Sequence, residues 1–99
     1  MAAGVILQFG PEVGEPEYRA VNSAIGLDMQ TGQGDWPDGL LSHNAGISDE
    51  GWVVTEVWES KDAQAAFMES RLGPAFHATN MPAPTKILWY EVSASQHRH

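Results

Sequence analysis

The alternation of hydrophobic and polar residues divides the chain into six elements. Short apolar or alternating runs predict four strands, at residues 4–9, 39–47, 52–58 and 85–92. Apolar residues at helical spacing predict two helices, at residues 16–27 and from a Ser60 N-cap to about 72, with one more turn at 76–77. The glycine- and proline-containing segment 28–38 is expected to be a loop. The order is therefore strand, helix, strand, strand, helix, strand.

This order predicts a ferredoxin-like α+β fold. Right-handed connections give a four-stranded antiparallel sheet with both helices on one face. The other face is left bare, and a second copy of the chain would cover it, which makes a homodimer. We expect one domain over residues 1–94 and a flexible tail at 95–99.

The tight turn between the second and third strands predicts which residues face each other. If Ser48 lies opposite Gly51, then His43 lies opposite Glu56 and Leu41 opposite Trp58. One face of this hairpin is apolar apart from one His and one Glu; it carries Leu41, His43, Ala45, Ile47, Trp52, Val54, Glu56 and Trp58.

His43 and Glu56 are the predicted catalytic pair. Directly opposed Cβ atoms lie about 4.5–5.5 Å apart, within reach of a hydrogen bond. A carboxylate beside an imidazole selects the ring's tautomer and suits the ring to act as a general base. The alternative is a purely structural polar pair at the edge of a sheet.

Seven further side chains are predicted to bind substrate around that pair: Tyr18, Leu41, Trp58, Phe67, Leu72, Phe76 and Trp89. Leu41 and Trp58 are expected to flank the pair and exclude water. Ordinary core packing is the alternative for most of the others. Trp89 and its neighbour Tyr90 must point to opposite faces of the last strand.

Composition excludes several partners and chemistries. The net charge is −8, from 13 acidic and 5 basic residues, which disfavours nucleic acid and anionic membranes as partners. The chain has no cysteine, so thiolate catalysis and cysteine-bound zinc are excluded, and a reducing cytoplasm is compatible. No apolar run approaches the roughly 20 residues of a membrane helix, and we expect no signal peptide.

Three segments carry a family resemblance. They are residues 39–46, residues 51–60 with the pattern W-x-V-x-x-V-W-E-S, and residues 71–75. Together they resemble small actinobacterial members of the dimeric α+β barrel superfamily, similar to the antibiotic biosynthesis monooxygenase group. The resemblance implies a homodimer with a pocket between sheet and helices in each protomer. It also implies chemistry without metal or flavin, in which the carbanion of a polyphenolic substrate reduces dioxygen.

The fold does not choose the reaction, so two functions stay open. The first is a cofactor-independent enzyme acting on an aromatic or polyketide-like molecule, as a monooxygenase or as an isomerase or cyclase. The second is a non-catalytic protein that binds a hydrophobic ligand or haem, with His43 or His77 as the axial ligand. In a third reading the pocket is filled by side chains.

Overall fold

The computed structural model describes residues 2–28, 31, 33–34 and 36–94, and its main elements follow the predicted order. The predicted tail at 95–99 lies outside the described residues. The elements are β1 (Ala3–Gln8), α1 (Glu15–Ala24), β2 (Leu27–Asp28), β3 (Gln33–Gly34), β4 (Leu40–Ser48), β5 (Gly51–Trp58), α2 (Lys61–Phe67), η1 (Met68–Leu72), α3 (Gly73–Thr79) and β6 (Lys86–Glu91).

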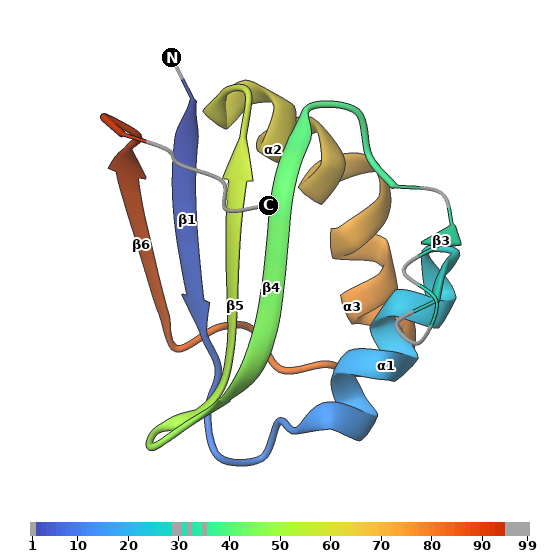
Figure 1. The fold of residues 1–99 in the computed structure, drawn as a ribbon. Helices are drawn as coiled ribbons and strands as arrows, with labels where there is room; N and C mark the ends of the chain where they lie inside the picture. The colour runs from blue at the N-terminus through green and yellow to red at the C-terminus, as the bar shows by residue number, and fades with distance from the viewer. Residues whose placement is uncertain (1, 29–30, 32, 35, 95–99) are drawn as a thin grey trace.

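The main sheet has the strand order β4-β5-β1-β6, and every neighbouring pair is antiparallel. Figure 1 shows the helices packed on one side of this sheet, as predicted. The predicted ferredoxin-like α+β fold is confirmed. The core lies between the two layers, where Val5, Leu7 and Trp58 are buried. Within the described ranges, no helix is long and apolar enough to cross a membrane.

The segment predicted to be a loop contains a small two-stranded sheet. β2 and β3 pair antiparallel, so Leu27 begins a strand instead of ending the first helix. Gly26 has a φ of 85°, a conformation that suits glycine, and it turns the chain out of α1. A Cβ atom on Gly34 would lie 2.2 Å from the Gly26 carbonyl oxygen, so the two segments approach closely. Strands of two residues are too short for an alternation pattern to reveal.

The second helical region continues further than predicted and contains a π-turn. Ser60 is the N-cap, and its Oγ accepts a hydrogen bond of 3.1 Å from the Ala63 N–H, as expected. Pro74 lacks an N–H and would clash with the preceding turn of a regular α-helix. The chain widens there, and the Gly73 N–H bonds to the carbonyl of Met68, five residues back. The helix then continues to Thr79.

Candidate active site

The β4–β5 hairpin has the predicted register over most of its length. Ser48 pairs with Gly51, and His43 pairs with Glu56. A bulge then shifts the register, so that Leu40 pairs with Trp58. The prediction that Leu41 faces Trp58 is therefore wrong. Leu41 is the extra residue of the bulge, and its side chain is 57% exposed.

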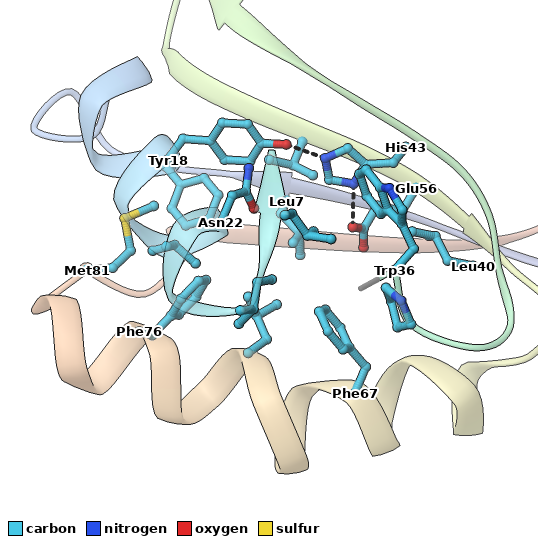
Figure 2. Close-up of a pocket in the computed structure, with 17 residues that line it drawn as sticks. Leu7, Tyr18, Asn22, Trp36, Leu40, His43, Glu56, Phe67, Phe76 and Met81 are labelled. Carbon is cyan, nitrogen blue, oxygen red and sulfur yellow. Dashed lines mark hydrogen bonds and ion pairs between the residues drawn. The ribbon is translucent and has the colours of Figure 1, made fainter. Parts of the chain in front are cut away.

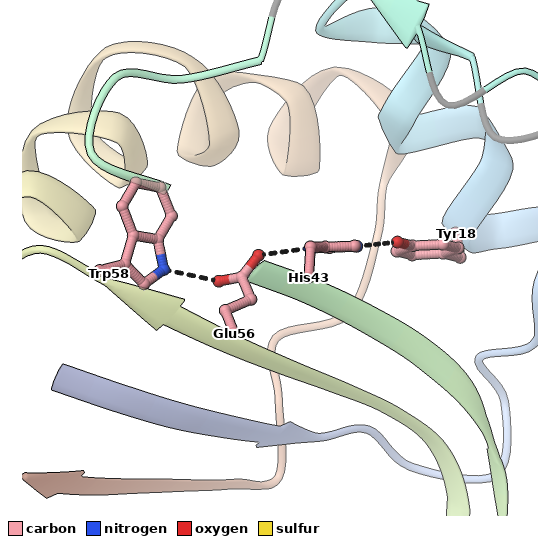
Figure 3. Close-up of polar contacts among 4 residues, drawn as sticks. All are labelled: Tyr18, His43, Glu56 and Trp58. Atoms are coloured by element: carbon pink, nitrogen blue, oxygen red, sulfur yellow. Dashed lines mark hydrogen bonds and ion pairs between the residues drawn. The ribbon is translucent and has the colours of Figure 1, made fainter. Parts of the chain in front are cut away.

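Four side chains form one hydrogen-bonded row across the helix-covered face of the sheet (Figure 3). His43 Nδ1 lies 2.8 Å from Glu56 Oε2, and the Trp58 indole N–H donates to Glu56 Oε1 at 3.0 Å. The Tyr18 hydroxyl bonds to His43 Nε2. We name this row, Trp58–Glu56–His43–Tyr18, the relay.

The partners of His43 select its tautomer. A carboxylate can only accept hydrogen bonds, so Nδ1 carries the hydrogen that faces Glu56. In the neutral ring Nε2 then presents its lone pair, and the Tyr18 O–H donates to it. The imidazole is thus oriented as a proton acceptor at Nε2.

Burial keeps the Tyr18 phenol protonated. Burial raises the pKa of Tyr18, the negative charge of Glu56 raises this pKa further, and a hydrogen bond from Asn22 lowers it. The net shift is upward from 10.0, so Tyr18 is a hydrogen-bond donor at neutral pH. Glu56 itself is buried, and its two oxygens are held by His43 and Trp58.

Helix α1 positions Tyr18 because its first turn is well capped. The Gly14 N–H donates to Glu17 Oε1 at 2.7 Å, and the Tyr18 N–H bonds to the Gly14 carbonyl. The Tyr18 ring packs on Trp52 with 5.2 Å between ring centroids. These contacts direct the phenol toward β4.

Three members of the relay, Tyr18, His43 and Glu56, line a partly open cavity between sheet and helices (Figure 2). The space open to the centre of a water molecule is about 40 Å³. The wall is almost entirely apolar and is formed by Leu7, Phe9, Tyr18, Val21, Asn22, Ile25, Leu27, Trp36, Pro37, Leu40, His43, Val54, Glu56, Phe67, Leu72, Phe76 and Met81. Four predicted substrate-binding residues, Tyr18, Phe67, Leu72 and Phe76, are among them.

Trp58 and Trp89, like Leu41, do not line this cavity. Trp58 has no exposed surface, and its indole is turned to Glu56, so it supports the relay instead of holding a ring. Trp89 lies opposite Val5, on the helix-covered side as predicted, whereas Tyr90 lies opposite Gly4. β1 separates β6 from β5, so Trp89 is too far from the cavity and packs beside Lys61.

Two outer hollows adjoin the cavity. One of about 300 Å³ is bordered by α1, Trp36 and β4, and another of about 250 Å³ by Trp36 and Leu41. His43 and Trp36 line the cavity and both hollows. Their rings lie 5.6 Å apart, centroid to centroid. His43 therefore lies where the cavity and the two hollows meet.

Sequence reasoning missed eleven of the seventeen residues that line the cavity, among them Asn22, Trp36 and Leu40. Trp36 lies in a segment rich in glycine and proline, where no periodicity assigns a direction to a side chain. Asn22 follows Tyr18 by four residues, one helical turn, and that spacing was the available signal. Leu40 replaces Leu41 because of the bulge.

The described residues contain no group of three or more His, Asp or Glu side chains arranged to hold a metal ion. The haem reading also meets an obstacle, because both ring nitrogens of His43 are already hydrogen-bonded. His77 is exposed on α3 and is not part of the cavity wall. An axial bond to His43 would first have to displace Tyr18.

The site lies in a ferredoxin-like α+β domain, the fold that the resemblance implied. No protein-family model matches the chain, and no curated protein matches it. Two solved structures share its fold. "Structure of Rv0793 from Mycobacterium tuberculosis" has a TM-score of 0.59 at 18% identity, covering 98% of this chain and 100% of the other. A monooxygenase from the gene ActVA-Orf6 of Streptomyces coelicolor, in complex with Nanaomycin D, has a TM-score of 0.55 at 22% identity, covering 99% and 91%.

Proposed function

We propose that this protein is a cofactor-independent enzyme that removes a proton from an aromatic, polyketide-like small molecule. The observation that carries the proposal is the buried His43–Glu56 pair, with Tyr18 on its other side, at the wall of an apolar cavity. The reaction is either an oxygenation or a redox-neutral isomerisation or cyclisation. The Streptomyces coelicolor monooxygenase of the same fold supports the first.

His43 is the base in this proposal, and Glu56 is its positioning residue. The substrate gives its proton to the Tyr18 hydroxyl, which passes its own hydrogen to His43 Nε2. Glu56 stabilises the imidazolium that forms, as the carboxylate of a catalytic triad does. No Lys or Arg side chain is among the described wall residues, which favours a neutral substrate.

The organic substrate fits the outer hollow better than the cavity between sheet and helices. Pockets for drug-sized ligands measure about 300–1,000 Å³. The cavity of about 40 Å³ is far below that range, whereas the hollow of about 300 Å³ reaches it. Tyr18, Trp36 and His43 line the hollow, so a ring there meets two aromatic faces and the base.

We further propose a homodimer through the uncovered sheet face, located in the cytoplasm. Leu88 and Tyr90 are half-exposed on that face, and Thr55 and Val57 of β5 lie level with them across β1. Tyr90 covers Gly4, whose Cβ position would fall 2.0 Å from the phenol ring. An apolar face of this kind needs a partner surface. The absence of cysteine is compatible with a reducing compartment.

Turnover of dithranol, a hydroxylated anthrone, tests the proposal. Formation of the quinone and uptake of dioxygen are followed for the wild type, His43→Ala and His77→Ala. His43→Ala should lower turnover by about 10²–10⁴-fold, the usual contribution of a general base. His77→Ala removes an imidazole outside the site, so this variant should oxidise dithranol at the wild-type rate. Equal rates in both variants would remove His43 from the mechanism, and binding without turnover in the wild type would favour the ligand-binding alternative.

A further inference from the structure

The cavity between sheet and helices is too small for an aromatic ring. In another protein, a cavity of about 150 Å³ binds benzene. In the cavity here, the space open to the centre of a water molecule is only about 40 Å³. A water molecule needs about 10–15 Å³ of such space, so small molecules fit.

The cavity is also too apolar to hold water well. A buried water needs about two to four polar partners. Besides the indole of Trp36, four polar side chains line the cavity, and they are largely hydrogen-bonded to each other or to Trp58. Asn22, the fourth, bonds to Tyr18. The rest of the wall is formed by aliphatic and aromatic side chains and Pro37.

We propose that this cavity is the binding site for dioxygen as the second substrate, a proposal that rests on the proposed function and selects its oxidative form. Dioxygen is small, apolar and neutral, which are the properties that the cavity's volume and wall select. The cavity meets the outer hollow at His43, Tyr18 and Trp36. The organic substrate in the hollow and dioxygen in the cavity would therefore meet at the base.

The arrangement also places charge where the reaction needs it. When His43 takes the substrate proton, it becomes a cation at the wall of the cavity, paired with buried Glu56. The substrate carbanion then gives one electron to dioxygen, and the superoxide that forms lies beside this cation, in an apolar environment that strengthens the attraction.

The atoms balance without a further reductant. The substrate radical and superoxide combine to a C–O bond, giving a peroxide. The peroxide anion first takes the proton held by His43 and becomes a hydroperoxide. His43 then removes the second hydrogen of the same carbon as a proton, so that the O–O bond breaks, hydroxide departs and a carbonyl remains. The departing hydroxide takes the proton held by His43 and leaves as water. One methylene and one dioxygen thus give one carbonyl and one water.

Paramagnetic relaxation by dissolved dioxygen tests the site without any organic substrate. Methyl protons of Leu7, Val54 and Leu72 line the cavity, whereas Val13 is equally buried but lies outside its wall. In the wild type, the wall methyls should relax several-fold faster under dioxygen than those of Val13. Equal enhancement at both places would overturn the proposal.

A variant that fills the cavity, compared with a matched control, tests whether the cavity contributes to turnover. Val21→Met adds a flexible side chain to the wall, and Val13→Met makes the same change elsewhere in the core. Val21→Met should abolish the excess relaxation and raise the KM for dioxygen about tenfold with dithranol, the effect of about 1.4 kcal/mol. The KM for dithranol and the Val13→Met protein should change little.

The failures are distinguishable. A filled cavity with an unchanged KM for dioxygen would show that the oxidant does not bind there. A wild type that consumes no dioxygen with dithranol counts against the proposed function. In that case the wild-type relaxation measurement still tests whether dioxygen binds in the cavity. The same measurement tests this if Val21→Met fails to fold.

Discussion

The two faces of strand β5 differ in where the strand carries its charge. An antiparallel sheet commonly packs an apolar face on the core and turns a polar face to water. On β5 the helix-covered face holds the charged Glu56 between Val54 and Trp58, whereas the open face holds only Val53, Thr55 and Val57. A single strand thus buries a carboxylate on one face and leaves Val53 and Val57 partly exposed on the other.

Burial of Glu56 without a partner would be costly, since an unpaired charge in the interior loses its hydration. Here His43 and Trp58 bind one carboxylate oxygen each. This buried polar row reduces the apolar content of the core, which a purely structural sheet would not need. In our proposal, one face of the sheet serves chemistry and the other binds a partner.

Among substitutions that alter one face of the sheet, we expect the largest effect on turnover from a change at Glu56. Glu56→Gln replaces an oxygen by an NH2 group, although two donors, His43 Nδ1–H and the Trp58 indole, point at the site. The amide oxygen can accept from both only at the loss of one good geometry, so the His43 hydrogen moves to Nε2 in part of the molecules. We expect turnover of dithranol to fall about 10²-fold or more.

NMR of the nitrogen-labelled imidazole shows whether Glu56 acts by positioning His43. The signal of the Nε2-protonated tautomer should rise in Glu56→Gln. Glu59→Gln removes the same charge from the exposed end of the hairpin and should change neither tautomer nor rate. A loss of turnover with the tautomer unaltered would contradict the assigned role.

The open face gives the next largest effect. Leu88 lies opposite Ile6 on that face and is 50% exposed, whereas its neighbour Ile87 is 53% exposed on the other face, opposite Leu7. Leu88→Glu would place a charge within the proposed dimer interface. Its dimer dissociation constant should rise at least about tenfold, or about 1.4 kcal/mol, by sedimentation equilibrium.

Ile87→Glu is the matched control, because it puts the same charge one residue away on the helix-covered side. It should leave the dimer intact. If the wild type sediments as a monomer at every concentration, the proposed homodimer is wrong. The proposal for the helix-covered face does not depend on that result.

The fold was largely predictable because each main strand is an apolar or alternating run and the helical regions carry apolar residues at helical spacing. The pairing of His43 with Glu56 followed from the even length of one turn, which preserves the face on which each residue lies. The β2–β3 hairpin and the π-turn at Pro74 escaped because each depends on local geometry that has no period.

The cavity wall was less predictable, because it depends on how the layers are placed. Leu41 was displaced by one bulge, and Trp89 by the position of β6 at the far edge of the sheet. Trp58 lies on the predicted face, but the direction of its indole follows from the carboxylate beside it. Sequence periodicity predicts the face on which a residue lies, but it does not predict which side chain that residue contacts.

The smallest expected effect compares the two tyrosines, one on each side of the sheet. Because burial raises the pKa of Tyr18, the folded protein holds this proton more tightly than the unfolded chain. The stability gained is complete below the ordinary value of 10.0 and is lost as pH rises from there through the higher pKa of the folded state. Tyr18→Phe removes this loss, although it also breaks the bond to His43 and should cost about 1 kcal/mol at neutral pH.

Urea unfolding at about pH 8 and about pH 11 measures the difference between the tyrosines. The wild type and Tyr90→Phe should lose more stability between these values than Tyr18→Phe does, since Tyr90 is half-exposed on the open face. Glu56 and His43, the ionisable groups that face Tyr18, are present in all three proteins. The comparison therefore isolates the effect of the Tyr18 hydroxyl. An equal alkaline loss in all three would mean that the Tyr18 proton is not held by burial, and that the relay is open to solvent at this end.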